Sequence, residues 1–308
     1  MNPIFKDPVL QEQFETNGYV VLPFFSQADI DALLLGYQNL PDINDEGFFA
    51  NMFSDNIAYK KMTHDLITGV AQKAVDTLLI NYKIVAASYV TKKNGESSYM
   101  PPHQDWSVVD ETKYVSLNIW FPLVEVSKDN GAIYLLRKCH TLPIVNRGTL
   151  IPSAFNKVTN MNFETLTYLP MKPGEVLIYD HRMIHASPPN TTNQTRIAVA
   201  TLTVPQDVQL VHFFQNPETN KIEKYQIEDD FFLHYTYGMN KLPENAKFLE
   251  NVSYINPEFT DSDIEPLLEH KPVAVAKEMA TTPFGTISSK SDSVWGKIKR
   301  IFTSVNQS

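Results

Sequence analysis

The sequence predicts a mainly β protein with flanking α-helices, whose short strands form a closed double sheet. From about residue 83 to residue 215, short β-prone runs follow one another without long helical stretches between them. Turn dipeptides such as Asn94-Gly95, Asn130-Gly131 and Pro173-Gly174 punctuate these runs. Regular alternation of strands with long helices would instead indicate a parallel sheet, so this pattern favours strands that close into two packed sheets.

The segment before this core predicts three helices that pack against one sheet. Two of them carry apolar faces, formed by Ile30, Leu33, Leu34 and Tyr37 and by Met62, Leu66, Val70, Ala74 and Leu78. The expected helices run from Asp7-Pro8 through Phe14 to a stop at Gly18, from Ser26 with Asp29 in a capping box, and from about Tyr59 to Ile80.

The expected strands are β-branched or apolar runs bounded by turn residues. They are Tyr19–Leu22, Ile84–Thr91, Val115–Pro122, Ala132–Leu136, Val176–Tyr179, Arg196–Val204 and Val208–Phe214. Residues 216–269 are mixed in character and give no firm assignment. We expect one domain over residues 1–269.

Composition excludes several classes of protein. The chain has 308 residues, is 43% hydrophobic and 20% charged, and carries a formal net charge of -9, which argues against broad binding to nucleic acid or anionic membranes. Cys139 is the only cysteine, which suits a reducing cytoplasm, and the first residues lack the apolar region of a signal peptide. No apolar run reaches the ~18–20 residues of a membrane span. We expect a cytoplasmic protein, monomeric or homodimeric.

Two histidines and one aspartate predict a metal centre. His103-Gln104-Asp105 places an imidazole and a carboxylate on the same side of an extended chain, because side chains alternate along a strand. Together with His185 they would bind a divalent metal on one face and leave the opposite positions open, as non-haem Fe(II) oxygen chemistry requires. A 2-oxo acid would occupy two of those positions and O₂ the third.

Arg196 decides which histidine completes the predicted centre. His181 and His185 have the same strand parity, so alternation alone does not distinguish them. A hairpin that starts at His185 brings Arg196 close enough to pair with the far carboxylate of 2-oxoglutarate bound to the metal. We therefore assign His185 to the metal and His181 to the surroundings or the surface. The residues indicate an Fe(II)- and 2-oxoglutarate-dependent oxygenase.

The sequence also resembles the phytanoyl-CoA dioxygenase-like branch of the Fe(II)/2-oxoglutarate oxygenases, from about Gln13 to Val204. The motifs that carry the resemblance are Phe14-x-x-x-Gly18-Tyr19-Val20-Val21, His103-Gln104-Asp105, Ile119-Trp120-x-Pro122-Leu123, Asn130-Gly131-Ala132 with the stretch ending at His140, and His185-x-Ser187-x-x-Asn190 with Arg196. The family pattern Gly-Ser-His is here Lys138-Cys139-His140, and we treat His140 as structural.

The resemblance implies a fold and a set of roles. The fold is a double-stranded β-helix, the jelly-roll of cupin-like proteins, with N-terminal helices packed on one sheet. His103, Asp105 and His185 would bind iron, and Arg196 with Ser187 would bind the distal carboxylate of 2-oxoglutarate. Trp120 and Tyr89 match positions that line the co-substrate pocket. A halogenase of this layout replaces the carboxylate with a small residue, so Asp105 favours hydroxylation or another oxidation of a small metabolite without halide, with release of succinate and CO₂.

Two alternatives remain open at this point. A cupin-like hydrolase or isomerase could use the same three ligands to hold Zn²⁺ and activate water. A non-catalytic binding barrel is the other. The sequence names no substrate in any of the three cases.

The carboxyl-terminal segment differs from the rest of the chain. Residues 270–292 are rich in Ala, Thr, Ser and Pro and predict a flexible linker. Residues 293–308 predict a short amphipathic helix whose face of Trp295, Ile298, Ile301 and Phe302 could dock on a membrane surface or a partner, or fold back on the core.

Overall fold

The computed structural model describes residues 3–41, 46–235, 242 and 245–268. Its largest element is a six-stranded antiparallel sheet in the order β1-β8-β5-β10-β3-β2. The strands are β1 (Tyr19–Pro23), β2 (Phe48–Ala50), β3 (Tyr82–Lys92), β5 (Leu117–Pro122), β8 (Glu175–Asp180) and β10 (Arg196–Pro205). β1 and β2 precede residue 83, so the double-sheet core takes in strands from the segment expected to be mainly helical.

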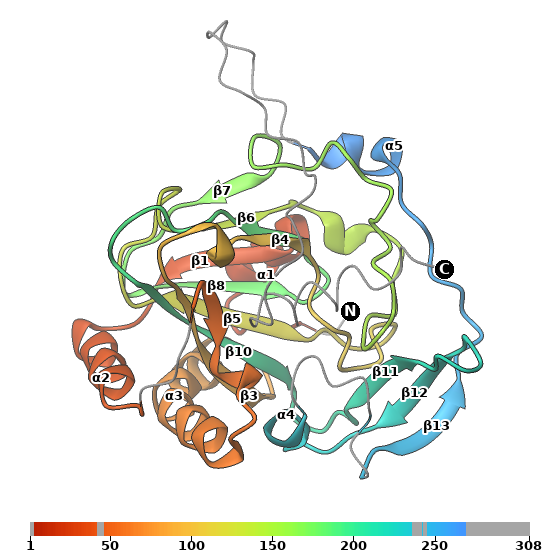
Figure 1. Cartoon of the computed structure of the whole chain (residues 1–308), viewed down its shortest axis with the longest axis horizontal. Helices are drawn as coiled ribbons and strands as arrows, with labels where there is room; N and C mark the ends of the chain where they lie inside the picture. The colour runs from red at the N-terminus through yellow and green to blue at the C-terminus, as the bar shows by residue number, and fades with distance from the viewer. Residues whose placement is uncertain (1–2, 42–45, 236–241, 243–244, 269–308) are drawn as a thin grey trace, which may run out of the picture.

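A four-stranded antiparallel sheet in the order β4-β9-β6-β7 forms the second half of the core (Figure 1). Its strands are β4 (Met100–His103), β6 (Ile133–Leu135), β7 (Thr167–Leu169) and β9 (His185–Ser187). In the β4–β9 pair, His103 lies opposite His185. The two antiparallel sheets with flanking helices confirm the predicted mainly β class with a jelly-roll core.

A third sheet, most of which comes from the unassigned residues 216–269, stands beside the core (Figure 1). It joins β11 (Val211–Gln215), β12 (Ile222–Gln226) and β13 (Lys247–Asn251). The run expected at Val208–Phe214 therefore pairs in this sheet rather than in the double-sheet core. Two short helices, α4 (Phe231–His234) and α5 (Asp261–Ile264), belong to the same part of the chain.

The three predicted helices are present. α1 (Pro8–Asn17) starts at the Asp7 cap and ends at Gly18, where a φ of 84° lies in the left-handed region that favours glycine. α2 (Gln27–Gln38) begins with the predicted capping box of Ser26 and Asp29. α3 (Ile57–Leu78) packs against β3.

The buried face of α3 differs from the predicted one. Met62 is 42% exposed, whereas Thr63, Ile67 and Ala71 are buried. A stripe of residues spaced by four drifts around a helix of 3.6 residues per turn, so it marks one face over only a few turns. The buried residues follow the mixed spacing of three and four instead.

Strand alternation divides the core into two layers. Leu117, Ile119 and Phe121 of β5 pack towards the helices, whereas Trp120 belongs to the cluster that also contains residues of the second sheet. The side chains at even-numbered positions of β5 and β10 therefore face the interior of the double sheet. Trp120, Ala198 and Arg196 are at such positions.

The predicted linker (residues 270–292) and amphipathic helix (residues 293–308) lie outside the described residues. Within the part of the chain that the structure describes, no helix has both the length and the apolar character needed to cross a bilayer.

Candidate active site

His103, Asp105 and His185 come together at one end of the double sheet. Each offers one ligand atom, and these atoms lie within 4.8 Å of one another. The β4–β9 register places the two histidines opposite each other, with ring centroids 4.2 Å apart and ring planes tilted by 49°. Nε2 of His185 lies 4.0 Å from Oδ1 of Asp105. The three residues predicted to bind metal therefore share one centre.

Backbone carbonyls orient both imidazoles. Nδ1 of His103 lies 2.8 Å from the carbonyl of Pro101, and Nδ1 of His185 lies 3.2 Å from the carbonyl of Met183. When each Nδ1 donates its hydrogen to the carbonyl, the lone pair is on Nε2, the nitrogen that can bind a metal. Burial and the neighbouring His185 lower the pKa of His103 to about 4, so its imidazole is neutral at physiological pH.

The two oxygens of Asp105 have different surroundings. Oδ1 faces His185, whereas Oδ2 lies 3.4 Å from the Asn118 amide nitrogen and 3.5 Å from the Tyr179 hydroxyl. Burial raises the pKa of the carboxyl, but the three surrounding imidazoles and the Asn118 amide outweigh it and lower the pKa to about 2. Asp105 is therefore ionised and ready to bind a cation.

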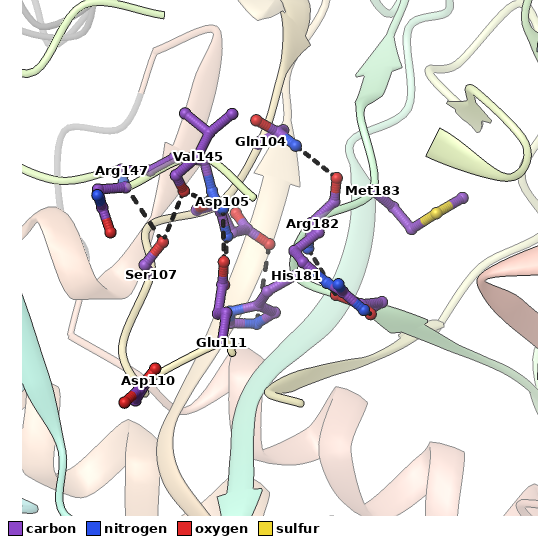
Figure 2. A network of polar contacts seen from close by, with 12 residues as sticks. Gln104, Asp105, Ser107, Asp110, Glu111, Val145, Arg147, His181, Arg182 and Met183 are labelled. Atoms are coloured by element: carbon purple, nitrogen blue, oxygen red, sulfur yellow. Dashed lines mark hydrogen bonds and ion pairs between the residues drawn. The ribbon is translucent and has the colours of Figure 1, made fainter. Parts of the chain in front are cut away.

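A buried ion pair holds the backbone of Asp105 in place (Figure 2). Nε of Arg147 donates to the Asp105 carbonyl at 2.6 Å, and its two terminal nitrogens bond both carboxylate oxygens of Glu111 at 2.6 and 2.9 Å. Between the same segments, the Ser107 N–H donates to the Arg147 carbonyl at 3.1 Å, and the Arg147 N–H donates to the Ser107 hydroxyl at 3.3 Å. The chain leading from Asp105 to Glu111 is thus fixed at both ends by one guanidinium.

Arg196 lies inside the double sheet with its charge uncompensated by any described carboxylate. It is 2% exposed, its Nη1 donates to the Val90 carbonyl at 3.3 Å, and its Nε has no hydrogen-bond partner. Its guanidinium carbon is 5.8 Å from the centroid of the Trp120 ring. Burial lowers the pKa of Arg196 to about 9, which leaves it protonated at pH 7.

Lys92 is a second buried basic residue beside Arg196, and sequence reasoning missed it. Burial and the neighbouring Arg196 lower the pKa of Lys92 well below its ordinary value. The two residues are directly opposite each other in the β3–β10 register. Nζ of Lys92 donates to the carbonyls of Ser98, Ser187 and Pro188 at 2.6–3.0 Å. The predicted ligand Ser187 therefore lies beside Lys92, although its own hydroxyl donates to the Gly131 carbonyl at 2.8 Å.

Tyr89 does not join the residues predicted to line the co-substrate pocket. Its side chain faces α2, where its hydroxyl donates to the Leu33 carbonyl at 2.8 Å. Its neighbour Val90 has the opposite parity and lies on the interior face with Trp120. The expectation for Tyr89 is corrected on this ground: Tyr89 supports the sheet from outside.

His181 lies on the far side of Asp105 from the other two histidines. Its Nε2 is 3.9 Å from Oδ2 of Asp105, beyond hydrogen-bonding distance, and it does not belong to the group of converging ligand atoms. The side chain is 5% exposed. His181 is thus part of the site's wall rather than a surface residue.

His140 ties two segments together away from this centre. Its Nε2 lies 3.1 Å from the Glu15 carbonyl in α1. Lys138, which replaces the family's glycine, has a φ of 64° in the left-handed region. The local backbone has thus kept the conformation that a glycine would favour.

A model of the family described as "Phytanoyl-CoA dioxygenase (PhyH)" matches residues 14–198, more than half of the chain. The chain belongs to the phytanoyl-CoA dioxygenase family. The matched region contains both sheets of the core up to Ala198, all three converging ligands and Arg196.

Two curated relatives are similar to this member of the phytanoyl-CoA dioxygenase family. "Phytanoyl-CoA dioxygenase domain-containing protein 1 homolog" of Dictyostelium discoideum is 25% identical over 154 residues, which cover 47% of this chain and 52% of the relative. "Phytanoyl-CoA dioxygenase domain-containing protein 1" of Danio rerio is 22% identical over 147 residues, covering 45% and 50%. The matched part of the chain spans about half the length of these relatives.

Solved structures are also similar to this phytanoyl-CoA dioxygenase family member. The epimerase SnoN in complex with Fe³⁺, alpha ketoglutarate and nogalamycin RO is 17% identical, with a TM-score of 0.48 over 66% of this chain and 87% of SnoN. HygX from Streptomyces hygroscopicus with nickel and 2-oxoglutarate bound is 14% identical, with a TM-score of 0.47 over 65% and 88%.

Sequence reasoning missed Lys92, Asn118 and Arg147 in this family member's site. Asn118 lies in the predicted strand Val115–Pro122, and Lys92 follows the predicted strand Ile84–Thr91 by one residue. Both positions have the parity that faces the interior, and that parity was the available signal. Arg147 lies in a segment without periodicity, and nothing in the sequence pairs it with Asp105.

Proposed function

We propose that the protein is an Fe(II)- and 2-oxoglutarate-dependent oxygenase that oxidises a small metabolite, by hydroxylation, with release of succinate and CO₂. The observation that carries the proposal is the pairing of a three-ligand centre with Arg196 and Lys92 inside one double sheet. The buried Arg196 guanidinium has no described carboxylate beside it, which is costly unless a ligand supplies the negative charge. Family membership supports the same activity.

The residues fit the metal and co-substrate in chemistry and in number. Two Nε2 atoms and one carboxylate oxygen give a face of three ligands, as non-haem Fe(II) sites of this class use. Arg196 presents a planar guanidinium that pairs with two oxygens of one carboxylate. Trp120 lies beside this guanidinium and would exclude water from an ion pair formed with a bound carboxylate, which would strengthen that pair.

When bound, Fe(II) and 2-oxoglutarate would supply the activation of O₂ and the decarboxylation that yields succinate. The chain's own part is to bind and orient. His103, Asp105 and His185 would hold the metal, and Arg196 would fix the distal carboxylate and so set the direction of the co-substrate. Arg147 and Glu111 keep Asp105 at its position while ligands exchange. Because Asp105 would occupy a coordination position, halide has no place to bind and halogenation is not expected.

Succinate formation tests the proposal. Full-length protein with Fe(II), ascorbate and 2-oxoglutarate should release succinate slowly even without the primary substrate, and faster with compounds from a metabolite library. Asp105→Ala should abolish both rates. Succinate absent under every condition, together with hydrolysis activated by Zn²⁺, would contradict the oxygenase and favour the metal-dependent hydrolase.

A further inference from the structure

A cavity opens inside the core beside Asp105, on the side away from Arg196. The space it encloses, open solvent included, is about 550 Å³. β10 contributes Ala200 and Leu202 to the wall, whereas Arg196 is at the start of that strand and does not line the cavity. The cavity therefore reaches the metal centre from a different direction than the co-substrate anchor.

The described wall of this cavity is mainly apolar and carries no cation. Met52, Ala86, Val108, Leu202 and Phe232 supply apolar surface. Asp105 is the one charged residue among the described lining. An anion placed there would meet the Asp105 carboxylate without any compensating charge from these residues, which is unfavourable in a buried site.

Unsatisfied polar atoms gather on one side of this cavity, next to Asp105. Both ring nitrogens of His181 and Oδ1 of Asn118 are buried without hydrogen-bond partners. The two hydroxyls in the lining are already used, because Ser88 donates to the Tyr89 carbonyl and Thr201 pairs with Thr203. His181 and Asn118 are thus the groups in this wall with hydrogen bonds left to make.

We propose that the cavity binds the primary substrate, an uncharged and mainly apolar molecule, and that His181 and Asn118 hold a hydroxyl group on it. A hydroxyl both donates and accepts, so it can satisfy Oδ1 of Asn118 and the N–H of His181 together. That the bound molecule is the one oxidised rests on the proposed oxygenase function. A substrate that carries a phosphate or coenzyme A group inside this cavity is not expected.

His181 and Asn118 lie close enough to the metal centre to determine which carbon of the substrate is oxidised. The Asn118 amide nitrogen is 3.4 Å and His181 Nε2 is 3.9 Å from Oδ2 of the ligand Asp105. A hydroxyl held by this pair fixes the molecule at a point adjoining the metal centre, while the apolar wall accepts the rest. His181 and Asn118 are therefore specificity-determining residues.

Three matched probes test the proposal on the full-length, metal-free chain: butylbenzene, 4-butylphenol and 4-butylbenzoate. They share an apolar body and differ in having no polar group, a hydroxyl, or a carboxylate. Isothermal titration should give at least tenfold tighter binding of 4-butylphenol than of the other two. His181→Leu should remove that preference while retaining butylbenzene. His234→Leu, a change at an exposed histidine 44% accessible in its side chain, is the control and should keep the preference.

A second measurement needs no variant. In the wild-type protein, the ring nitrogen signals of His181 in an NMR titration should shift and saturate with 4-butylphenol, and should shift less with butylbenzene at equal occupancy. Equal affinities for 4-butylphenol and butylbenzene would mean that water satisfies the polar pair, and would overturn the proposal. Tighter binding of 4-butylbenzoate, or no binding of any probe, would overturn it as well. These outcomes are independent of succinate formation, so they are distinguishable from failure of the oxygenase assignment.

Discussion

Nε of Arg147 donates a 2.6 Å hydrogen bond to the backbone carbonyl of Asp105, and the same guanidinium grips both oxygens of Glu111 (Figure 2). The side chains of Arg147 and Glu111 are 8% and 3% exposed. The proposed ligand Asp105 is thus anchored through its main chain by a residue from another segment, which leaves its carboxylate to the metal centre.

Removal of this anchor should weaken metal binding. Outer residues that orient ligands typically change metal affinity by about 10–100-fold. Arg147→Ala should therefore lower the affinity for Fe(II) by about tenfold or more, measured by anaerobic titration. It should also reduce the free energy of unfolding by about 3–5 kcal/mol, because Glu111 would remain as an unpaired buried charge.

A double variant separates positioning from stability. Replacement of both partners by apolar residues of similar size, in Arg147→Met with Glu111→Leu, should restore much of the stability. The Fe(II) affinity should stay low because the Asp105 carbonyl has lost its donor. Recovery of full metal affinity in the double variant would show that Arg147 acts on stability alone.

The three converging residues should each be required for metal binding. His103→Ala, Asp105→Ala and His185→Ala should each lose stoichiometric Fe(II) binding and Fe(II)-dependent succinate formation. His181→Leu is the matched control for metal binding, since its Nε2 faces Oδ2 of Asp105 rather than the centre. It should retain one Fe(II) per chain, and loss of that ion would make His181 a ligand.

Arg196 should control the affinity for 2-oxoglutarate. Loss of one partner from a buried charge pair costs about 2–5 kcal/mol. Arg196→Ala should raise the Michaelis constant for 2-oxoglutarate by a factor of tens or more, and Arg196→Lys should restore only part of it because a single ammonium does not pair with two oxygens at once. An unchanged Michaelis constant in the alanine variant would remove Arg196 from the co-substrate site.

His212 should make stability depend on pH, away from the metal centre. Burial lowers the pKa of His212 from the ordinary 6.5 to about 3. Between these values the unfolded chain binds more protons than the folded one, so stability is full above pH 6.5 and is lost as pH falls towards 3. His212→Gln should flatten the fall in melting temperature between pH 7 and about pH 4.5. The difference between wild type and variant is the readout, because the lowered pKa of His103 acts in the same direction. Equal slopes would show that His212 is already accessible to protons.

The carboxyl-terminal segment remains a sequence-based prediction. If residues 293–308 form a docking helix, a chain truncated after residue 270 should keep its melting temperature and its 2-oxoglutarate turnover, and lose association with anionic vesicles. Ile264 and Leu268, which pack in the core cluster, are retained in that truncation. A large drop in melting temperature would mean that the segment packs on the fold.

Short-range sequence signals, such as helix caps and stops, predicted much of the fold. The caps at Asp7 and Ser26 and the stop at Gly18 depend only on neighbouring residues in the sequence. These helix ends were therefore located correctly. The strands β4 and β9 escaped prediction because each spans only three or four residues. The third sheet escaped because the strands β12 and β13 lack a clear apolar alternation; both are held by pairing with neighbours.

The part of the site that could be predicted consists of residues close together in the sequence, whose spacing shows which side chains share a face. His103 ends β4 and Asp105 follows two residues later, and the two side chains converge as their spacing predicted. The expected hairpin from His185 to Arg196 is wrong, because β9 and β10 lie in different sheets. Tyr89 was misplaced because a strand's parity relative to the core depends on the register with its partners, which one sequence does not display. Arg147 and Glu111 meet Asp105 only through the tertiary fold.

Anaerobic titration of the Fe(II)-loaded, full-length chain with 2-oxoglutarate tests the central claim most directly. Chelation of Fe(II) by a 2-oxo acid produces a visible charge-transfer absorption, which reports the metal and the co-substrate at the same time. We expect one saturating site per chain, dependent on Fe(II), abolished by Asp105→Ala and weakened by Arg196→Ala. No absorption change at saturating 2-oxoglutarate, with Fe(II) bound stoichiometrically, would contradict it.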